Sequence, residues 1–279
     1  MAILSVDLAC RSWADLGVVV LRRAQASHVP GGMASSPAAQ RAIPVSREPI
    51  ECEILSLMDE GDAPLAVDPN LLAGRINHLC NLRGIRVVML DGPQAWKSQS
   101  NGLAHSRVSE RQLNTAGKTG LPGMVKPVTY RAFAEFCLDV YDALCRRGWK
   151  RLETKEQPGS PQDRLLVESY PHAAWKSLGL KPLPSKRRTL VSDLAEAYGA
   201  LNALIPIAAN RPPNHDQLQA IVGGLPGLAL DERNAAEARI VGNPPRREGG
   251  HWREGFIVLP VPPKATPRLT WLDSMRWLD

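Results

Sequence analysis

Short apolar runs in the first third of the chain are typical of β-strands. They cover residues 2–9, 16–21 and 50–57, and the last of these partly alternates apolar with polar side chains. A further run at 85–90 (IRVVML) predicts a buried strand that stops at Asp91, where Gly92 and Pro93 follow. These patterns predict an antiparallel beginning followed by a more deeply buried strand.

Helical spacing of apolar residues appears between and after these strands. Leucine and isoleucine recur over residues 71–82, and Gly84 follows as a predicted C-cap. Thr129, Ser192 and Asn214 are predicted N-caps of three later helices, the first of which runs to Arg147. Two further strands are predicted at 164–170 and 256–261.

Two polar segments rich in small residues interrupt this order. Residues 24–47 predict a flexible loop, and residues 92–127 form a glycine-rich insertion too long for a simple connection. Three strands, a helix, a strand, the insertion and then further helices and strands predict an α/β fold with a mixed central sheet flanked by helices. The length of 279 residues is compatible with a single domain over 1–279.

The net charge of the chain indicates which class of binding partner to expect. Thirty-four basic against 28 acidic residues give a net charge of +6, with clusters such as Arg146-Arg147 and Lys186-Arg187-Arg188. This balance favours a polyanion such as nucleic acid. No stretch is long and apolar enough for a membrane span, and no signal-peptide pattern opens the chain. Five cysteines without a C-x-x-C pair suggest reduced thiols in a cytoplasmic protein.

Four acids lie where the pattern predicts strand or helix ends. Asp7 interrupts the first strand, Asp91 ends the fourth, Glu168 interrupts the apolar run LLVESY, and Asp216 opens a helix. A buried carboxylate requires a cation, a metal or water, and carboxylate oxygens suit Mg²⁺ or Mn²⁺. Each acid alone could equally be salt-bridged or cap a helix. Together they predict a metal site of the kind that hydrolyses phosphodiesters.

Several short motifs carry a family resemblance. They are SVDLA, MLDGP, HSRVSERQL, VESYPHAAWKSLGL, LPSKRRT, NHDQLQAIVGG and VGNPPRREGGHWREGFIVLP, in this order. Together they resemble the family built on the domain of unknown function four-two-nine, regarded as predicted RNase H-like nucleases. The resemblance spans roughly residues 2–261, apart from the loop at 24–47.

This resemblance implies an RNase H-like fold and assigns roles to residues. Asp7, Asp91, Glu168 and Asp216 would be the catalytic, metal-binding acids. Arg107 and Glu110 would match an R-x-x-E insertion motif and Lys186 an S-K segment, and Arg107, Lys186 and Arg187 would hold phosphate. The family's helix often carries a second acid three residues after the first. Here Gln219 takes that place after Asp216 and would replace a carboxylate ligand, so one metal would be weakly held.

Two other functions remain open from the sequence. A module on the same fold could bind nucleic acid through its basic face without cutting it. An actin-like sugar kinase or ATPase would need a glycine- and threonine-rich turn after Asp7, which Leu8-Ala9-Cys10-Arg11 does not supply. Ala116-Gly117-Lys118-Thr119 resembles the end of a phosphate loop, but Gln112 stands where that motif needs its first glycine.

Overall fold

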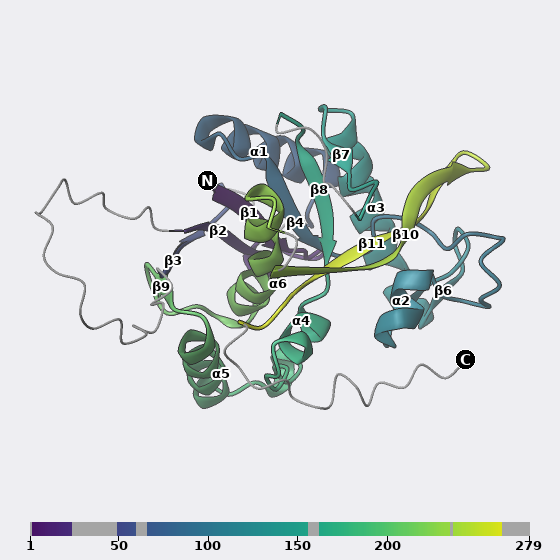
Figure 1. Cartoon of the computed structure of the whole chain (residues 1–279). Coiled ribbons are helices and arrows are strands. Elements are labelled where there is room, and N and C mark those ends of the chain that lie inside the picture. Colours follow the sequence, from purple (N-terminus) through teal and green to yellow (C-terminus); the bar gives the residue numbers. More distant parts are fainter. Residues whose placement is uncertain (1, 24–48, 60–65, 156–161, 235–236, 264–279) are drawn as a thin grey trace, which may run out of the picture.

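A mixed nine-stranded sheet forms the centre of the protein (Figure 1). The computed structural model describes residues 2–23, 49–59, 66–155, 162–234 and 237–263, so the predicted loop at 24–47 lies outside the described residues. The strand order is β10-β11-β8-β4-β1-β2-β3-β9, with β7 paired to β8. In the described ranges no helix is long and apolar enough to cross a membrane. The predicted α/β class with a mixed sheet is confirmed.

The central strands combine an antiparallel meander with parallel strands. The meander is β1 (Ala2–Asp7), β2 (Gly17–Arg23) and β3 (Ile50–Leu55). β4 (Val87–Asp91) runs parallel to β1, and β8 (Leu165–Ser169) runs parallel to β4. The short strands β7 (Lys150–Arg151) and β9 (Ile207–Ala209) pair in parallel with β8 and β3. The carboxyl ends of β1, β4 and β8 therefore meet at one edge of the sheet.

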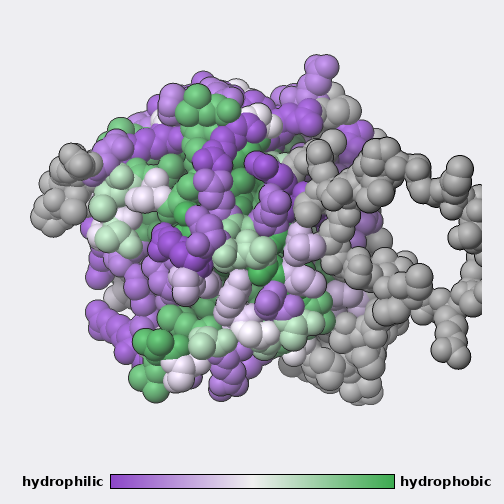
Figure 2. All heavy atoms as spheres, turned by 90° about the vertical axis from the view of Figure 1, so that its left-hand side faces the viewer, coloured by the Kyte–Doolittle hydropathy of each residue, from purple (hydrophilic) through white to green (hydrophobic). Residues whose placement is uncertain are grey.

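Helices cover both faces, and alternation along each strand assigns side chains to one face or the other. α1 (Pro69–Arg83) and α3 (Arg131–Cys145) cover the face that contains Leu4 and Leu90. α4 (Pro171–Ser177), α5 (Val191–Leu204) and α6 (His215–Asp231) cover the face that contains Ile3 and Met89. Figure 2 views the molecule from the left-hand side of Figure 1, where apolar residues are interspersed among polar ones.

Two of the predicted helix caps are confirmed, and the other two helices begin at residues other than the predicted caps. The Asn214 side chain accepts a 2.9 Å hydrogen bond from the Gln217 amide at the start of α6, and Gly84 ends α1 with a φ of 63°. Thr129 lies in a short 3-10 helix before α3, and α5 begins one residue before Ser192. Apolar periodicity located the helices, whereas local hydrogen bonding decided their ends.

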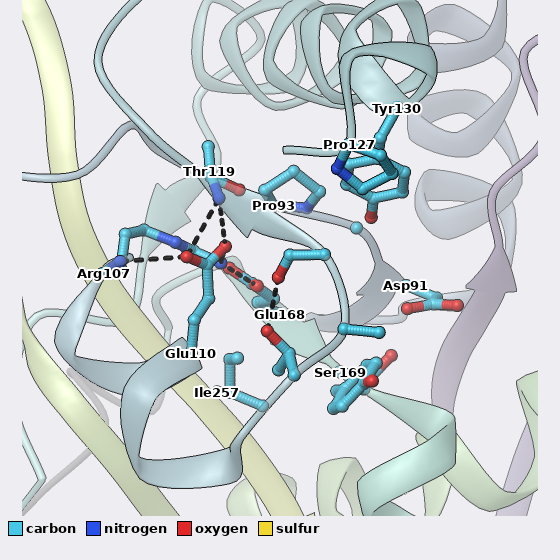
Figure 3. A pocket seen from close by; sticks show the side chains of 15 residues that line it. Asp91, Pro93, Arg107, Glu110, Thr119, Pro127, Tyr130, Glu168, Ser169 and Ile257 are labelled. Atoms are coloured by element: carbon cyan, nitrogen blue, oxygen red, sulfur yellow. Dashed lines mark hydrogen bonds and ion pairs between the residues drawn. The ribbon is translucent and has the colours of Figure 1, made fainter. Parts of the chain in front are cut away.

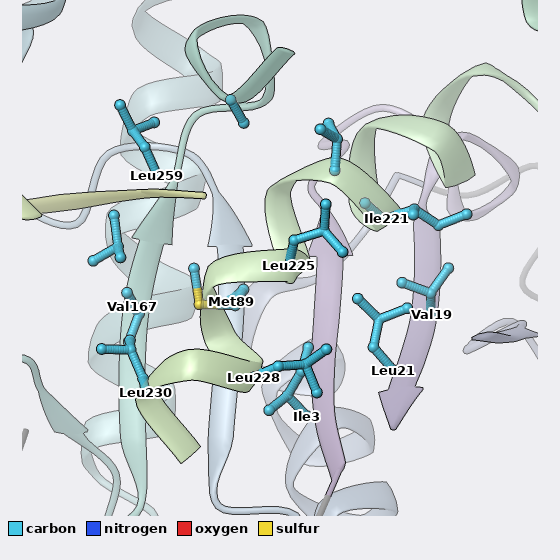
Figure 4. Close-up of a cluster of buried hydrophobic side chains, with 14 of the residues drawn as sticks. Ile3, Val19, Leu21, Met89, Val167, Ile221, Leu225, Leu228, Leu230 and Leu259 are labelled. Atoms are coloured by element: carbon cyan, nitrogen blue, oxygen red, sulfur yellow. The ribbon is translucent and has the colours of Figure 1, made fainter. Parts of the chain in front are cut away.

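Three glycines let α6 lie directly on the sheet (Figure 4). A Cβ built on Gly224 would lie 2.7 Å from the Cβ of Ser5, and one on Gly227 would lie 2.8 Å from Cγ of Met89. Gly223 approaches Ser169 almost as closely, at 3.0 Å from its Oγ. A Cβ at Gly224 or Gly227 would force the neighbouring side chains to shift and one at Gly223 would crowd Ser169, so the close approach of helix and strands is favoured by glycine at these positions.

The edge of the sheet next to β8 is a long hairpin of β10 (Ala238–Glu248) and β11 (His251–Pro260). The sequence predicted a strand only at 256–261. Pro244 and Pro245 argue against a strand, yet β10 is an edge strand, where a residue without an amide donor is tolerated. The pairing register shifts between Asn243 and Arg246, where these prolines lie.

The insertion after β4 is structured and is joined to this hairpin. It contains α2 (Val108–Leu113), β5 (Lys118–Thr119) and β6 (Val125–Lys126). The fully buried Glu254 of β11 accepts hydrogen bonds from the amides of Ser98 (2.9 Å) and Val108 (2.8 Å) and from Asn101 Nδ2 (2.6 Å). One carboxylate thus joins three points of the insertion to the sheet.

We expect Gly224→Ala to destabilise the protein by about 1–3 kcal/mol, because the added methyl group collides with Ser5 and Leu21. Gly199→Ala is the matched control, since a Cβ on Gly199 in α5 has no neighbour within 4 Å. It should stabilise the protein by about 0.5–1 kcal/mol through helix propensity alone. Urea unfolding measures both, and equal effects of the two changes would contradict the close packing of α6.

Candidate functional site

Asp7 and Asp91 end two adjacent parallel strands. They are register partners in β1 and β4, so both side chains project from the same face of the sheet, the face that α6 covers. Their carboxyl groups share a hydrogen bond, which requires that one of them carries the proton. The strand ends therefore hold two like charges closer together than two ionised carboxylates tolerate.

Burial is the main cause of the abnormal acidity of this pair. It raises the pKa of Asp91 to about 7, with a smaller contribution from the charge of Glu168. Burial, the charge of Asp91 and the more distant charge of Asp216 raise the pKa of Asp7 well above its usual range. Lys186 opposes this effect at Asp7 without cancelling it. At neutral pH the pair retains a proton that a cation could replace.

Asp216 faces this pair from the first turn of α6. Gly17 is the register partner of Asp7 in β2, and a Cβ on Gly17 would lie only 2.1 Å from the backbone oxygen of Asp216. The absence of that side chain allows the first turn of α6 to reach the end of β1. The role of Gly17 could not be predicted from the sequence, since a glycine at a strand start has no local signal that distinguishes it from a turn residue.

Two cationic or hydrogen-bonding groups keep Asp216 ionised. Burial pushes the pKa of Asp216 upward, but hydrogen bonds from His215 and Lys186 outweigh it and place the pKa below its usual value. His215 Nδ1 lies 3.1 Å from Asp216 Oδ1, and its Nε2 lies 3.0 Å from the backbone oxygen of Pro184. Both neighbours are hydrogen-bond acceptors, so His215 lies between Asp216 and the Pro184 carbonyl and holds the start of α6 against the segment before Lys186.

Lys186 joins the acidic site to a basic turn. It ion-pairs with Asp216 and, at 2.7 Å, with Asp15. Burial lowers its pKa, but hydrogen bonds to Asp15 and Asp216 outweigh that effect and raise the pKa above its usual value. Arg187 and Arg188 follow in the same 3-10 helix and are exposed. A positive surface therefore borders the aspartates on the α6 side.

Glu168 points away from these three aspartates. It is the register partner of Leu90, so its side chain projects from the opposite face to that of Asp91. Its two oxygens accept hydrogen bonds of 2.6 and 2.7 Å from the terminal nitrogens of Arg107, and one also accepts from the Gln94 amide at 3.0 Å. The structure thus brings together Asp7, Asp91 and Asp216 but holds Glu168 in a separate ion pair.

Arg107 and Glu110 were predicted to bind substrate, Arg107 through phosphate, but their observed contacts are within the protein. The Arg107 side chain is 1% exposed, and the charges of Glu168 and Glu110 raise its pKa although burial opposes them. Glu110 accepts hydrogen bonds from the Arg107 amide at 2.9 Å and from the Thr119 amide at 2.9 and 3.0 Å. The R-x-x-E motif therefore caps α2 and fastens it to β5. It does not present a free cation to solvent.

Gln219 also has a partner that the sequence did not reveal. Its side-chain oxygen accepts a 2.9 Å hydrogen bond from the indole nitrogen of the buried Trp175 in α4. The hypothesis that Gln219 stands in for a lost metal ligand therefore loses its basis, because that oxygen is engaged between α4 and α6. A residue three positions after Asp216 shares its helix face only approximately.

A cavity of about 420 Å³ opens beside Asp91. Its lining comes from the ends of β4 and β8 and from the insertion (Figure 3). Arg107, Glu110 and Glu168 form one side, while Pro93, Pro127 and Tyr130 lie across from them. Asp91 is thus shared between the cavity and the group of aspartates.

Asp7 and Asp91 are the side chains at the strand ends that could contribute oxygen ligands to a cation. Among the described residues no group of three or more His, Cys, Asp or Glu side chains is placed so that it could hold a metal ion. Mg²⁺ nevertheless commonly takes only one or two carboxylates from a protein and completes its shell with water and substrate phosphate. Asp7 and Asp91 supply two such carboxylates, and their shared proton marks a place where positive charge is favoured.

Comparisons with known proteins add nothing to this description of the site. No family model, no curated protein and no solved structure matches the chain.

The raised pKa values predict how stability depends on pH. The folded state binds more protons than the unfolded state between the usual aspartate pKa and about 7, so stability falls as pH rises through this interval. We expect Asp91→Asn to reduce this loss, because it removes one of the two buried carboxyl groups while Asp7 remains buried. In the presence of a chelator the variant should gain about 1–2 kcal/mol relative to the wild type between pH 5 and pH 8, by urea unfolding.

Asp68→Asn is the control for this measurement, because asparagine caps a helix as well as aspartate does and Asp68 is an exposed N-cap of α1. Its effect should be the same at both pH values. A wild-type curve parallel to that of Asp91→Asn would contradict the shared proton.

Proposed function

We propose that this protein has an RNase H-like fold and hydrolyses phosphodiester bonds of nucleic acid with the help of Mg²⁺ or Mn²⁺. The observation that carries the proposal is the hydrogen-bonded pair of Asp7 and Asp91, which faces the ionised Asp216 at the carboxyl ends of β1 and β4. The meander β1–β2–β3, continued by the parallel strands β4 and β8, supports the fold. So does the resemblance to predicted RNase H-like nucleases.

Each residue has a defined part in this proposal. Asp7 and Asp91 would hold the cation, and Asp216 would add negative charge from α6. A divalent ion supplies activation of water and stabilisation of the leaving oxygen. Lys186 and the exposed Arg187 would neutralise the phosphates of the approaching strand next to the acids. Glu168 would hold Arg107 and so fix the wall of the cavity beside Asp91.

A second candidate is a nucleic-acid-binding module that does not cut. The observation that favours it is the engagement of Glu168 by Arg107 and of Gln219 by Trp175, which removes two side chains from the acidic group. Both candidates require the basic surface, and only the first requires the cation.

Loss of the shared pair should abolish metal binding and cleavage together. At pH 8, Mg²⁺ or Mn²⁺ should raise the melting temperature of the wild type, because the ion binds only the folded state. Asp7→Asn should remove that shift and lower cleavage of labelled single-stranded DNA or RNA by roughly 100-fold or more, since a bound ion contributes several kcal/mol. Asp68→Asn should retain both properties. Binding of nucleic acid without cleavage in Mn²⁺ would favour the second candidate.

Affinity for nucleic acid should depend on salt through the turn at 186–188. We expect log K to fall linearly with log salt, and Arg187→Ala with Arg188→Ala to reduce the slope by up to about two. Arg131→Ala with Arg146→Ala removes the same charge from exposed positions at the two ends of α3, on the opposite face of the sheet. Fluorescence anisotropy with a labelled oligonucleotide distinguishes the pairs. Equal slopes for both pairs would show that the turn is not part of the binding surface.

A further inference from the structure

The cavity beside Asp91 contains polar atoms that the folded chain leaves without partners. Thr119 Oγ1 and Arg107 Nε are buried and have no hydrogen-bond partner among the described residues, and both residues line the cavity. Their residues are each 1% exposed. A buried polar atom left unpaired is unfavourable, so these two atoms point to a ligand that would satisfy them.

The charge of the lining excludes an anion as that ligand. Glu110 and Glu168 contribute two carboxylates against the single guanidinium of Arg107, and every oxygen of these acids already accepts a hydrogen bond. A phosphate placed here would meet net negative charge. Arg107 Nε can only donate and Thr119 Oγ1 can donate or accept, so the occupant offers an uncharged acceptor.

The remaining walls favour a flat, largely apolar molecule. Pro93, Pro127 and Ile257 present apolar surface, and Tyr130 and Tyr170 add aromatic rings. In Figure 3 Pro93 and Tyr130 lie across the cavity from Arg107 and Glu110. The volume of about 420 Å³ lies within the usual 300–1,000 Å³ of small-molecule sites. A nucleobase combines a flat apolar face with carbonyl and ring-nitrogen acceptors on its edge.

We propose that this cavity receives the base of the nucleotide that adjoins the scissile phosphate, an inference that rests on the proposed function. Asp91 lines the cavity and also belongs to the acidic pair, so a base inside would leave its phosphate beside Asp7 and Asp91. The phosphates that follow would lie toward Lys186 and Arg187. A base can enter only when it is unpaired, so the substrate is a strand end, a single strand or an extruded nucleotide and not the interior of an intact duplex.

The test begins with uncharged probes in a chelator, so that no cleavage is needed. Adenosine, guanosine, cytidine and uridine are titrated into the protein and followed by saturation-transfer NMR and calorimetry. We expect at least one nucleoside to bind, and inorganic phosphate not to displace it. Thr119→Val keeps the shape of the side chain and removes the hydroxyl, so it should weaken binding about 2- to 10-fold. Absence of binding by all four nucleosides would overturn the proposal.

Blocking the cavity provides a second, independent variant. Ala116 is exposed and lines the cavity, so Ala116→Trp should weaken nucleoside binding at least tenfold without loss of the fold. Ala200→Trp places the same side chain at an exposed position of α5 and should leave binding unchanged. Unchanged nucleoside affinity in both Ala116→Trp and Thr119→Val would refute the site.

Cleavage assays separate this inference from the proposed function. Asp7→Asn should abolish cleavage and still bind nucleosides, whereas Ala116→Trp should reduce both. A blunt duplex with paired ends should be cut at least tenfold more slowly than a single strand of the same sequence. If Ala116→Trp cleaves both substrates at the wild-type rate, the base site is wrong and hydrolysis stands. If nucleosides bind as expected but no substrate is cut in Mn²⁺, hydrolysis is wrong and the base site stands.

Discussion

The close contact between α6 and the sheet determines where the acids of this protein can meet. Gly224 and Gly227 let the helix approach β1, β2 and β4 to a separation at which a Cβ would force the neighbouring side chains to shift. Gly17 extends that contact to the first turn of α6, next to Asp7. A side chain at Gly17 would collide with the backbone of Asp216 itself, so it would displace the first turn of α6 and with it the position of Asp216 relative to Asp7 and Asp91. The packing of α6 on the sheet therefore also determines how close the charge of Asp216 lies to Asp7 and Asp91.

The acids at this end of the sheet form two groups, Glu110 with Glu168 and Asp7 with Asp91. The groups differ in how their negative charge is compensated. Glu168, Glu110 and Arg107 form a buried network in which every carboxylate oxygen has a donor, so both of its carboxylates are compensated within the folded chain, although Arg107 Nε has no partner among the described residues. Asp7 and Asp91, by contrast, share a single proton, and no cation from the described residues pairs with both of them. Complete networks of this kind contribute mainly to a unique arrangement, whereas incomplete ones mark places where an external ion or ligand completes the charge.

The sequence predicted what depends on local pattern and failed where long-range contacts decide. Alternation and helical spacing located β1, β2, β3, β4 and α6, and the Asn214 cap was confirmed because capping involves only neighbouring residues. The strand β10 was missed since prolines are judged unfavourable unless the strand is known to be at an edge. Short helices such as α2 and α4 were missed because so few residues show no periodicity.

Side-chain partners were harder to predict than side-chain chemistry. The acids at strand ends were recognised from their apolar surroundings, and three of the four face one another in the structure. The partners of Glu168 and Gln219 were missed because Arg107 is 61 residues from Glu168, and Trp175 is 44 residues from Gln219. Glu168 pairs with Leu90, one residue before Asp91, in the observed register of β4 and β8. Because side chains alternate between the two faces along a strand, this places Glu168 on the opposite face from Asp91.

The anchoring of the insertion by Glu254 has a consequence for the energetics of recognition. The amides of Ser98 and Val108, at the two ends of this segment, hydrogen-bond to one carboxylate that is itself part of β11, so the segment cannot detach without depriving the buried Glu254 of its donors. Its amides should therefore exchange with solvent on the same slow timescale as those of the hairpin, as one cooperative unit. A wall of this kind is preorganised. A molecule that enters the neighbouring cavity would not have to order it, and less of the interaction free energy would be lost to conformational entropy on binding.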